Sequence, residues 1–101
     1  MNPKINEQTT VKTNIELKEP SQYKVILMND DYTTKDFVTE ILKSIFNKSN
    51  VDAIALMEKV HALGSAEVGI YTYDIGSTKI SMTMRAARKE GFPLQCKLEE
   101  C

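Results

Sequence analysis

The sequence of 101 residues is poor in the side chains that build metal, disulfide and covalent sites. It contains two cysteines, one histidine and no tryptophan. A tetrahedral zinc site needs four ligands of these kinds, and a disulfide framework needs several cysteines. Cys96 and Cys101 are expected to be reduced, and Cys96 is predicted to be a small buried side chain in a late strand rather than a nucleophile. We expect no metal site and no cofactor.

An excess of one charge and a long apolar run are also missing. Thirteen Lys and Arg residues stand against 14 Asp and Glu, a net charge of -1. Nucleic acids and anionic membrane surfaces select for basic proteins. No stretch approaches the roughly 18 apolar residues of a membrane span, and the N-terminus is too polar for a secretory signal. The sequence therefore predicts a cytoplasmic protein that binds neither nucleic acid nor membrane.

The chain is expected to divide into a tail and one folded domain. Residues 1–22 consist largely of Asn, Gln, Thr, Lys and Glu, so the few apolar side chains among them do not offset the entropy cost of ordering this segment. We predict a flexible N-terminal extension over 1–22 and a single domain over 23–101. The rest of the chain is long enough for one core and one groove.

The first half of the domain predicts a strand followed by two helices. Tyr23–Met28 is rich in β-forming residues and ends in a polar triplet. Thr33 and Asp36 resemble a capping box, and apolar residues follow at helical spacing, namely Phe37, Val38, Ile41, Leu42, Ile45 and Phe46. A second helix is capped by Ser49 or Asn50 and stopped by Gly64. Its predicted common face carries Ile54, Met57, Val60 and His61.

The second half predicts a strand, a helix and a final strand. Val68–Tyr73 alternates as a strand, in which Gly69 indicates a bend or a close neighbour. The periodicity of Ile75–Glu90 fits either a strand or a helix, but helix-forming residues before Gly91 favour a helix. A short strand follows at Leu94–Leu98. The order β-α-α-β-α-β predicts an α+β fold, a small two-layer domain with a three-stranded antiparallel sheet and three helices.

Polar residues at the first turn and a histidine in the second helix form the candidate site. Asn29, Asp30 and Asp31 follow the first strand, where turn-forming and ligand-binding roles are about equally consistent with their composition. Met57 and His61 stand four residues apart, so they share a helix face. If these groups meet, they make an apolar pocket with a polar rim, which suits a ligand with a cationic head and an apolar body. A hydrolase is less consistent, because no motif places a nucleophile.

Three separated segments resemble the ClpS family of bacterial Clp protease adaptors. They are YKVILMNDDYT at Tyr23–Thr33, MEKVH at Met57–His61 and ARKEGFPLQCKLE at Ala87–Glu99. The resemblance covers Tyr23–Glu99. It implies a protein without catalytic activity that binds substrates with a destabilising N-terminal residue (Leu, Phe, Tyr or Trp) and delivers them to a ClpA-type AAA+ unfoldase.

The resemblance also assigns expected roles to residues of this chain. Asn29, Asp30 and His61, with Asp31 beside them, would hold the substrate's α-amino group. The side chain of the first substrate residue would lie in a hydrophobic pocket formed by Thr33, Val38, Met57, Val60 and Leu94. Asp74 and Lys79 would contact the unfoldase, and the extension over 1–22 would engage it during handover. An α-amino group has a pKa near 8, so it is largely cationic at neutral pH and suits amide and carboxylate oxygens.

Two residues depart from the family pattern. Lys35 stands at the rim of the expected pocket where the family commonly has methionine, and Thr34 stands where it commonly has proline. The first departure bears on which N-terminal residues the pocket prefers. The alternative is an interaction domain of ribosomal-stalk type that binds translation factors, which shares a small α+β architecture; an acid-dyad hydrolase ranks third.

Overall fold

The computed structural model describes residues 20–101 and contains the six predicted elements in the predicted order. They are β1 (Gln22–Met28), α2 (Lys35–Ser44), α3 (Asn50–Leu63), β2 (Ser65–Thr72), α4 (Tyr73–Lys89) and β3 (Gln95–Glu100). The ambiguous segment after β2 is a helix, as its residues favoured. The predicted extension lies outside the described residues except for 20–22, of which Gln22 already begins β1.

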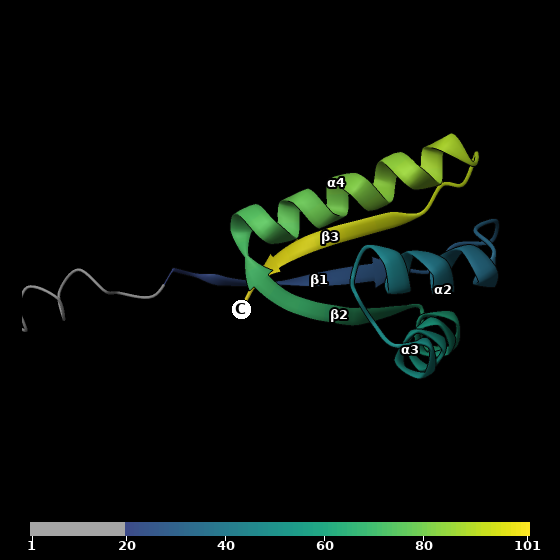
Figure 1. The fold of residues 1–101 in the computed structure, drawn as a ribbon, viewed down its shortest axis with the longest axis horizontal. Coiled ribbons are helices and arrows are strands. Elements are labelled where there is room, and N and C mark those ends of the chain that lie inside the picture. The colour runs from purple at the N-terminus through teal and green to yellow at the C-terminus, as the bar shows by residue number, and fades with distance from the viewer. Residues whose placement is uncertain (1–19) are drawn as a thin grey trace, which may run out of the picture.

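The three strands form one antiparallel sheet in the order β2-β1-β3, which confirms the predicted α+β fold (Figure 1). Val25 and Leu27 on the central strand are fully buried, whereas the residues that alternate with them, Lys24, Ile26 and Met28, are partly exposed. This alternation shows that one face of the sheet is covered. Helix α4 packs against all three strands, and α2 and α3 pack against each other near one end of the sheet.

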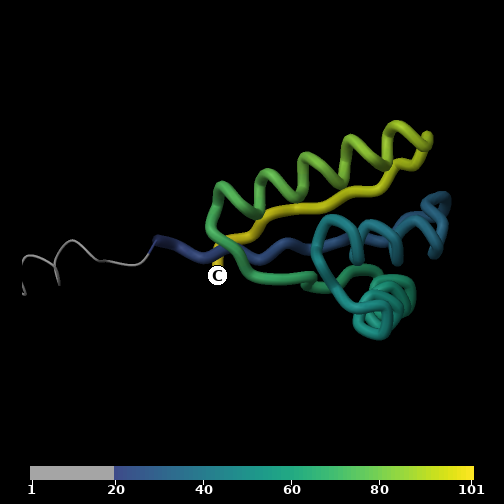
Figure 2. The backbone as a smooth tube through the Cα atoms, viewed as in Figure 1, coloured from purple at the N-terminus to yellow at the C-terminus, as the bar shows by residue number. Residues whose placement is uncertain are grey.

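The register of the strands gives the sheet two distinct ends. Gln22 pairs with Thr72 at one end, and Met28 pairs with both Ser65 and Gln95 at the other. At the first end the C-terminus returns beside the start of β1, where the N–H of Cys101 donates to the carbonyl of Gln22 at 2.9 Å (Figure 2). At the second end β1 runs into the turn that precedes α2. This second end holds the candidate site.

An irregularity in β2 confirms the special position of Gly69. Val25 pairs with Gly69 and Ile26 with Glu67, so Val68 is an extra residue that has no direct partner on β1. A Cβ atom on Gly69 would lie 2.6 Å from the hydroxyl oxygen of Tyr71. Glycine therefore leaves room for the aromatic side chain that packs along the bulged strand.

The helix ends correct one detail of the predicted pattern and confirm two others. The N-cap of α2 is Thr34 rather than Thr33, and its hydroxyl oxygen accepts a bond from the N–H of Phe37 at 3.2 Å. Ser49 caps α3 in the same way, and Gly64 ends that helix in the left-handed conformation, as predicted.

The predicted apolar face of α3 is wrong at one residue. Ile54 is 43% exposed, and the buried side chains of this helix are Ala53, Met57 and Val60. The sequence pattern favoured the larger aliphatic side chain, but the buried face of α3 is centred on Ala53, Met57 and Val60, so the small Ala53 takes the inward position instead.

Candidate functional site

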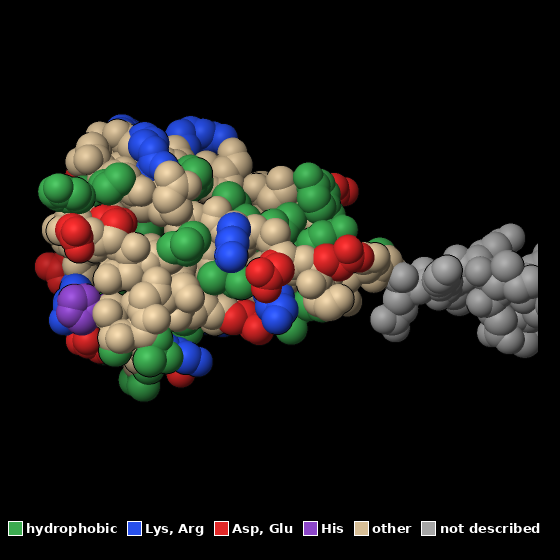
Figure 3. All heavy atoms as spheres, turned by 180° about the vertical axis from the view of Figure 1, so that it is seen from behind, with side chains coloured by type: hydrophobic (Ala, Val, Ile, Leu, Met, Phe, Trp, Pro, Cys, Tyr) green, Lys and Arg blue, Asp and Glu red, His purple; other side chains and the backbone are tan. Residues whose placement is uncertain are grey.

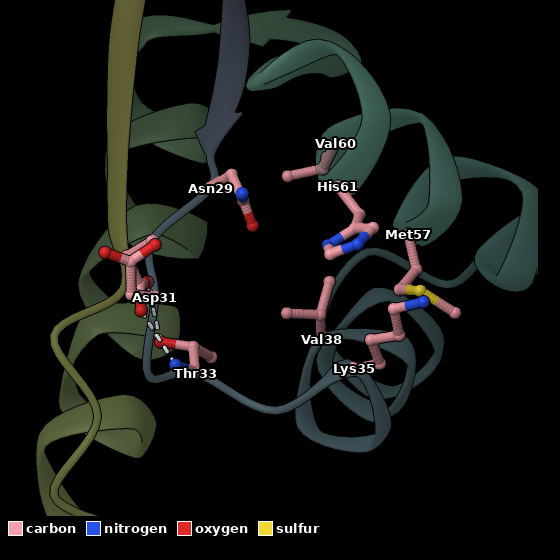
Figure 4. A pocket seen from close by; sticks show the side chains of 9 residues that line it. Asn29, Asp31, Thr33, Lys35, Val38, Met57, Val60 and His61 are labelled. Carbon is pink, nitrogen blue, oxygen red and sulfur yellow. Dashed lines mark hydrogen bonds between the residues drawn. The ribbon is translucent and has the colours of Figure 1, made fainter.

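A cavity of about 230 Å³ opens at the Met28 end of the sheet (Figure 4). Its walls come from the turn after β1 and from helices α2 and α3. The lining residues are Asn29, Asp30, Asp31, Thr33, Lys35, Val38, Met57, Val60 and His61. These nine were all predicted from the sequence as amine-binding or pocket residues. Leu94, predicted with them, does not line this cavity; it is only 1% exposed and belongs to the core.

The turn after β1 is organised by the carboxylate of Asp30. Its Oδ1 accepts bonds from the N–H groups of Tyr32 at 2.8 Å and Thr33 at 2.7 Å, and its Oδ2 accepts one from the Thr33 hydroxyl at 2.7 Å. The N–H of Asn29 donates to the carbonyl of Gly64 at 2.9 Å, which ties the turn to the end of α3. Both the N–H and the hydroxyl of Thr33 therefore bond within this turn, and the next residue is the N-cap of α2.

The same bonds favour the charged form of Asp30. Partial burial alone would raise the pKa of this carboxyl group, but the bonds from Thr33 and Tyr32 and the positive charge of Arg88 outweigh it, so the pKa lies below the usual 3.8. Asp30 is thus a carboxylate at neutral pH. Three donors occupy three of its roughly four acceptor positions, which leaves one for a ligand.

Asn29 and His61 face one another from opposite walls of the cavity. The Asn29 amide comes from the turn and the His61 imidazole from the last turn of α3, and both point into the space between them (Figure 4). Both residues are exposed to solvent. In the space-filling view the histidine, drawn in purple, lies at the surface among acidic and basic side chains (Figure 3). A ligand can therefore reach these polar groups from outside.

The deeper wall of the cavity is apolar. Val38 from α2 and Met57 and Val60 from α3 are each less than a tenth exposed. They belong to the continuous core of the domain, so their positions are fixed by packing on both sides. The cavity thus joins a polar end that accepts hydrogen bonds to an apolar wall that accepts a hydrophobic side chain.

Lys35 lies at the rim beside Met57 (Figure 4). Its Nζ stands 3.5 Å from the Oε1 of Glu58, and both side chains are about half exposed. An ion pair of this kind is weak in water, so it guides the lysine side chain without locking it. The aliphatic part of Lys35 borders the cavity while its charge stays in solvent.

Arg88 is a residue near the site that the sequence reasoning missed. It lies in the last turn of α4, and its Nη1 donates to the carbonyl oxygens of Phe92 and Leu94, both at 2.9 Å. Its charge is one of the influences on Asp30. Basic residues are common at helix C-termini, where they offset the helix dipole, so no sequence pattern distinguishes this one from an ordinary helix end.

The two residues predicted for the unfoldase lie on α4 and outside the cavity. Asp74 is exposed in the first turn of α4. Lys79 is partly buried: its Nζ donates to the carbonyl of Ile45 at 2.7 Å and lies 5.9 Å and 5.7 Å from the ring centres of Phe46 and Tyr71. Lys79 therefore also ties α4 to the end of α2. Asp74 is the more accessible of the two.

The cavity is lined by amide, carboxylate, imidazole and apolar groups. Within residues 20–101 no group of three or more His, Cys, Asp and Glu side chains is placed to hold a metal ion. Cys96 is buried in β3 as predicted, and burial raises its thiol pKa to about 12, so it is a thiol at neutral pH. No helix in the described part of the chain has the length and apolar character to span a bilayer. Fold and site together define a small α+β binding protein with an amphipathic pocket.

Comparison with known proteins gives the family. The family model for the ATP-dependent Clp protease adaptor protein ClpS matches residues 18–97. ClpS of Wolinella succinogenes is 49% identical over 93% of this chain and 92% of the relative, and ClpS of Treponema denticola is 56% identical over 81% of each. The structure of Agrobacterium tumefaciens ClpS2 bound to L-phenylalaninamide matches with a TM-score of 0.80 and 38% identity, covering 82% of this chain and 100% of that one.

The chain belongs to the ClpS family of Clp protease adaptors. This finding confirms the resemblance stated from the sequence and favours the adaptor over the ribosomal-stalk alternative. The relatives are named as adaptors, not as enzymes. The roles of the individual cavity residues stay predictions, to which the geometry above now gives a structural basis.

Proposed function

We propose that the protein recognises substrates by a free α-amino group and a large hydrophobic N-terminal residue (Leu, Phe, Tyr or Trp), and that it delivers them to a ClpA-type unfoldase of the Clp protease. The observation that carries this proposal is the division of one cavity into a polar end and an apolar wall. A solved relative that shares the fold binds L-phenylalaninamide, which has both a free amine and a large apolar side chain.

The polar end supplies acceptors for an ammonium group from different directions. Asn29 and Asp30 offer oxygen atoms from the turn, and His61 offers a ring nitrogen from α3. Asp31 adds a negative charge to the same turn. An ammonium group has three N–H donors, so it can use several of these acceptors at once. A peptide bond inside a chain has only one N–H and no charge, so the site would select chain ends.

The apolar wall would select the side chain that follows the amine. Val38, Met57 and Val60 present branched and thioether surfaces, and burying a Leu or Phe side chain against such surfaces is worth about 1.5 to 3 kcal/mol. Met57 is flexible and polarizable, so it can contact aliphatic and aromatic side chains alike. Small or charged first residues would gain much less.

Titration with matched small ligands tests the recognition step. L-phenylalaninamide should bind, and N-acetyl-L-phenylalaninamide should bind at least about tenfold more weakly, because acetylation removes the charge and its hydrogen bonds. L-alaninamide serves as the control for the apolar wall. Equal affinities for the free and acetylated compounds would overturn recognition through the amine.

Delivery is the second half of the proposal and is tested separately. Asp74 and Lys79 on α4 are the residues proposed to contact the unfoldase, outside the cavity. Purified protein should bind the N-terminal domain of a ClpA-type unfoldase equally well with and without saturating L-phenylalaninamide. Competition between the two ligands would contradict the separate placement of the two surfaces.

A further inference from the structure

Arg88 connects α4 to the segment that leads into β3. One nitrogen of its guanidinium group donates to two main-chain carbonyls, those of Phe92 and Leu94, at 2.9 Å each. Between these residues stands Pro93, which has no N–H to offer a neighbouring strand. The side chain of Arg88 therefore holds a stretch of backbone that precedes β3 and has no regular strand pairing.

The held segment runs beside the turn that carries the polar end of the cavity. Met28 and Gln95 are the last paired residues of β1 and β3. Continued one step further, the same register places Leu94 next to Asn29. The ribbon that leads into β3 passes directly beside the turn with Asp31 and Thr33 (Figure 4). The carbonyl that Arg88 holds is thus an immediate neighbour of the candidate amine site.

The charge of Arg88 reaches the same turn. Burial raises the pKa of the Asp30 carboxyl group and the bonds from Thr33 and Tyr32 lower it; the charge of Arg88 on α4 also lowers it, as the smallest of these influences. The other ionisable groups around the cavity are Asp31 on the turn itself, Lys35 on α2 and His61 on α3. The segment from Phe92 to Gln95 carries no charged side chain.

We propose that Arg88 is a positioning residue of the cavity: it holds the Phe92–Leu94 segment against the turn and adds a positive charge to the surroundings of the Asp30 carboxylate. Arg88 is not one of the residues that line the cavity, so this role is additional to those assigned above. The predicted effect on ligand affinity rests on the proposed function. Two separable effects follow, one through the hydrogen bonds and one through the charge.

Three variants separate these effects. Arg88→Gln removes both the charge and the paired bonds. Arg88→Lys keeps the charge, but a single ammonium group reproduces the two-carbonyl geometry poorly. Arg85→Gln is the matched control, because Arg85 is exposed on the same helix, bonds to Ser81 at 3.2 Å, and loses the same charge outside the cavity.

Two measurements are made on each folded variant and on the wild type. NMR of the Asp30 carboxyl carbon follows its titration without any ligand, and calorimetry gives the affinity for L-phenylalaninamide at neutral pH and along a pH series. In Arg88→Gln we expect the Asp30 titration to move to higher pH and the affinity to fall about tenfold. In Arg88→Lys we expect an unchanged titration and about a threefold loss of affinity. Arg85→Gln should match the wild type in both.

The outcomes distinguish this proposal from the proposed function. Wild-type affinity and an unmoved Asp30 titration in Arg88→Gln would overturn the role of Arg88. A loss of affinity with no change at Asp30 would indicate a merely structural residue and would also overturn it. If Arg88→Gln does not fold, Arg88→Lys replaces it in the test: wild-type affinity in Arg88→Lys would also overturn the role of Arg88. A wild type that fails to bind L-phenylalaninamide would contradict the proposed function instead, while the Asp30 titration would still test Arg88.

Discussion

The two ends of the sheet are built in opposite ways. At the Met28 end, a hydrogen-bonded turn and two helices surround a cavity. At the Gln22 end, α4 begins without a side-chain cap, and Tyr73 and Ile75 are more than half exposed next to Asp74. The six residue steps of β1 between the ends span about 20 Å. The difference teaches that one end offers a concave site for a small group, whereas the other exposes side chains at the start of α4, where the proposed contact with the unfoldase would lie.

Removing the N-terminal segment should have the largest effect on delivery and none on the cavity. Deleting residues 1–19 leaves β1 and every cavity residue in place. We expect unchanged affinity for L-phenylalaninamide but loss of delivery, because the segment is proposed to engage the unfoldase during handover. Degradation of a labelled substrate by purified Clp components measures this. Full degradation with the shortened protein would refute a role for the segment.

Asp30 should matter far more than its neighbour Asp31. Asp30→Ala removes a carboxylate that accepts three bonds within the turn, so both the ligand acceptor and the shape of the turn are lost. A lost bond to a charged group costs about 1.5 to 3 kcal/mol, so we expect binding of L-phenylalaninamide to weaken about ten- to hundredfold from the missing acceptor, and further from the disturbed turn. Calorimetry measures it.

Asp31→Ala provides the matched control for this comparison. It removes the same charge from the next residue, whose side chain is more exposed and is not used to organise the turn. We expect a loss of only a few-fold from the weaker negative potential. A loss as large as that of Asp30→Ala would show that charge alone, and not the ordered turn, determines the affinity.

Asp74→Lys should weaken binding of the unfoldase at the Gln22 end of the sheet, with an effect smaller than that of Asp30→Ala on the cavity. Reversing one exposed charge at an interface changes affinity by up to about tenfold and depends on ionic strength. Binding to the N-terminal domain of a ClpA-type unfoldase should weaken accordingly, and affinity for L-phenylalaninamide should stay unchanged. Glu90→Lys at the far end of α4 is the control. Equal weakening by both variants would mean that net charge, rather than this surface, controls the interaction.

The sequence was sufficient for the elements and for most of the cavity because local signals agree there. Alternation in β1, helical spacing in α2 and the glycine stop after α3 are each short-range patterns. The cavity residues became predictable through a family resemblance in three separated segments, which local patterns alone would not have joined. Periodicity could place Met57 and His61 on one helix face, but not opposite Asn29.

What escaped prediction depends on long-range packing. Thr33 resembled a helix cap, yet its hydroxyl bonds to Asp30, and this competition is visible only once the turn is built. Ile54 fitted the helical stripe, yet it is 43% exposed, and Ala53 beside it is buried instead. In the sequence Arg88 has the pattern of an ordinary basic residue at a helix C-terminus. Only the register of β3 shows that the backbone it bonds to lies beside the turn. Each case needs the relative position of two elements, which sequence spacing does not supply.

The smallest expected effect concerns Lys35, where this chain departs from the common family pattern. In the structure its ammonium group turns toward Glu58, outside the cavity, and its aliphatic stem borders the rim. Lys35→Met would replace a hydrated charge by an apolar thioether that stays over the mouth of the cavity, which adds about 0.5 to 1 kcal/mol of contact with a large first residue. It would also crowd the β-branched side chains of Ile and Val. We expect L-phenylalaninamide and L-leucinamide to bind about two- to fivefold more tightly, with a wider margin over the amides of Ile and Val.

Lys59→Met on α3 is the matched control for this last comparison, because it makes the same chemical change at an exposed residue that does not line the cavity. It should leave all four affinities unchanged. Glu58→Gln tests the restraint itself: without its ion pair Lys35 is free to swing away, and since exposed pairs contribute at most about 1 kcal/mol, the ranking of the four amides should shift less than in Lys35→Met. Fluorescence or calorimetric titrations of the four amides decide between these outcomes. An unchanged ranking in Lys35→Met would mean that the lysine stem does not contact the bound side chain, and that selection among first residues is made entirely by Val38, Met57 and Val60.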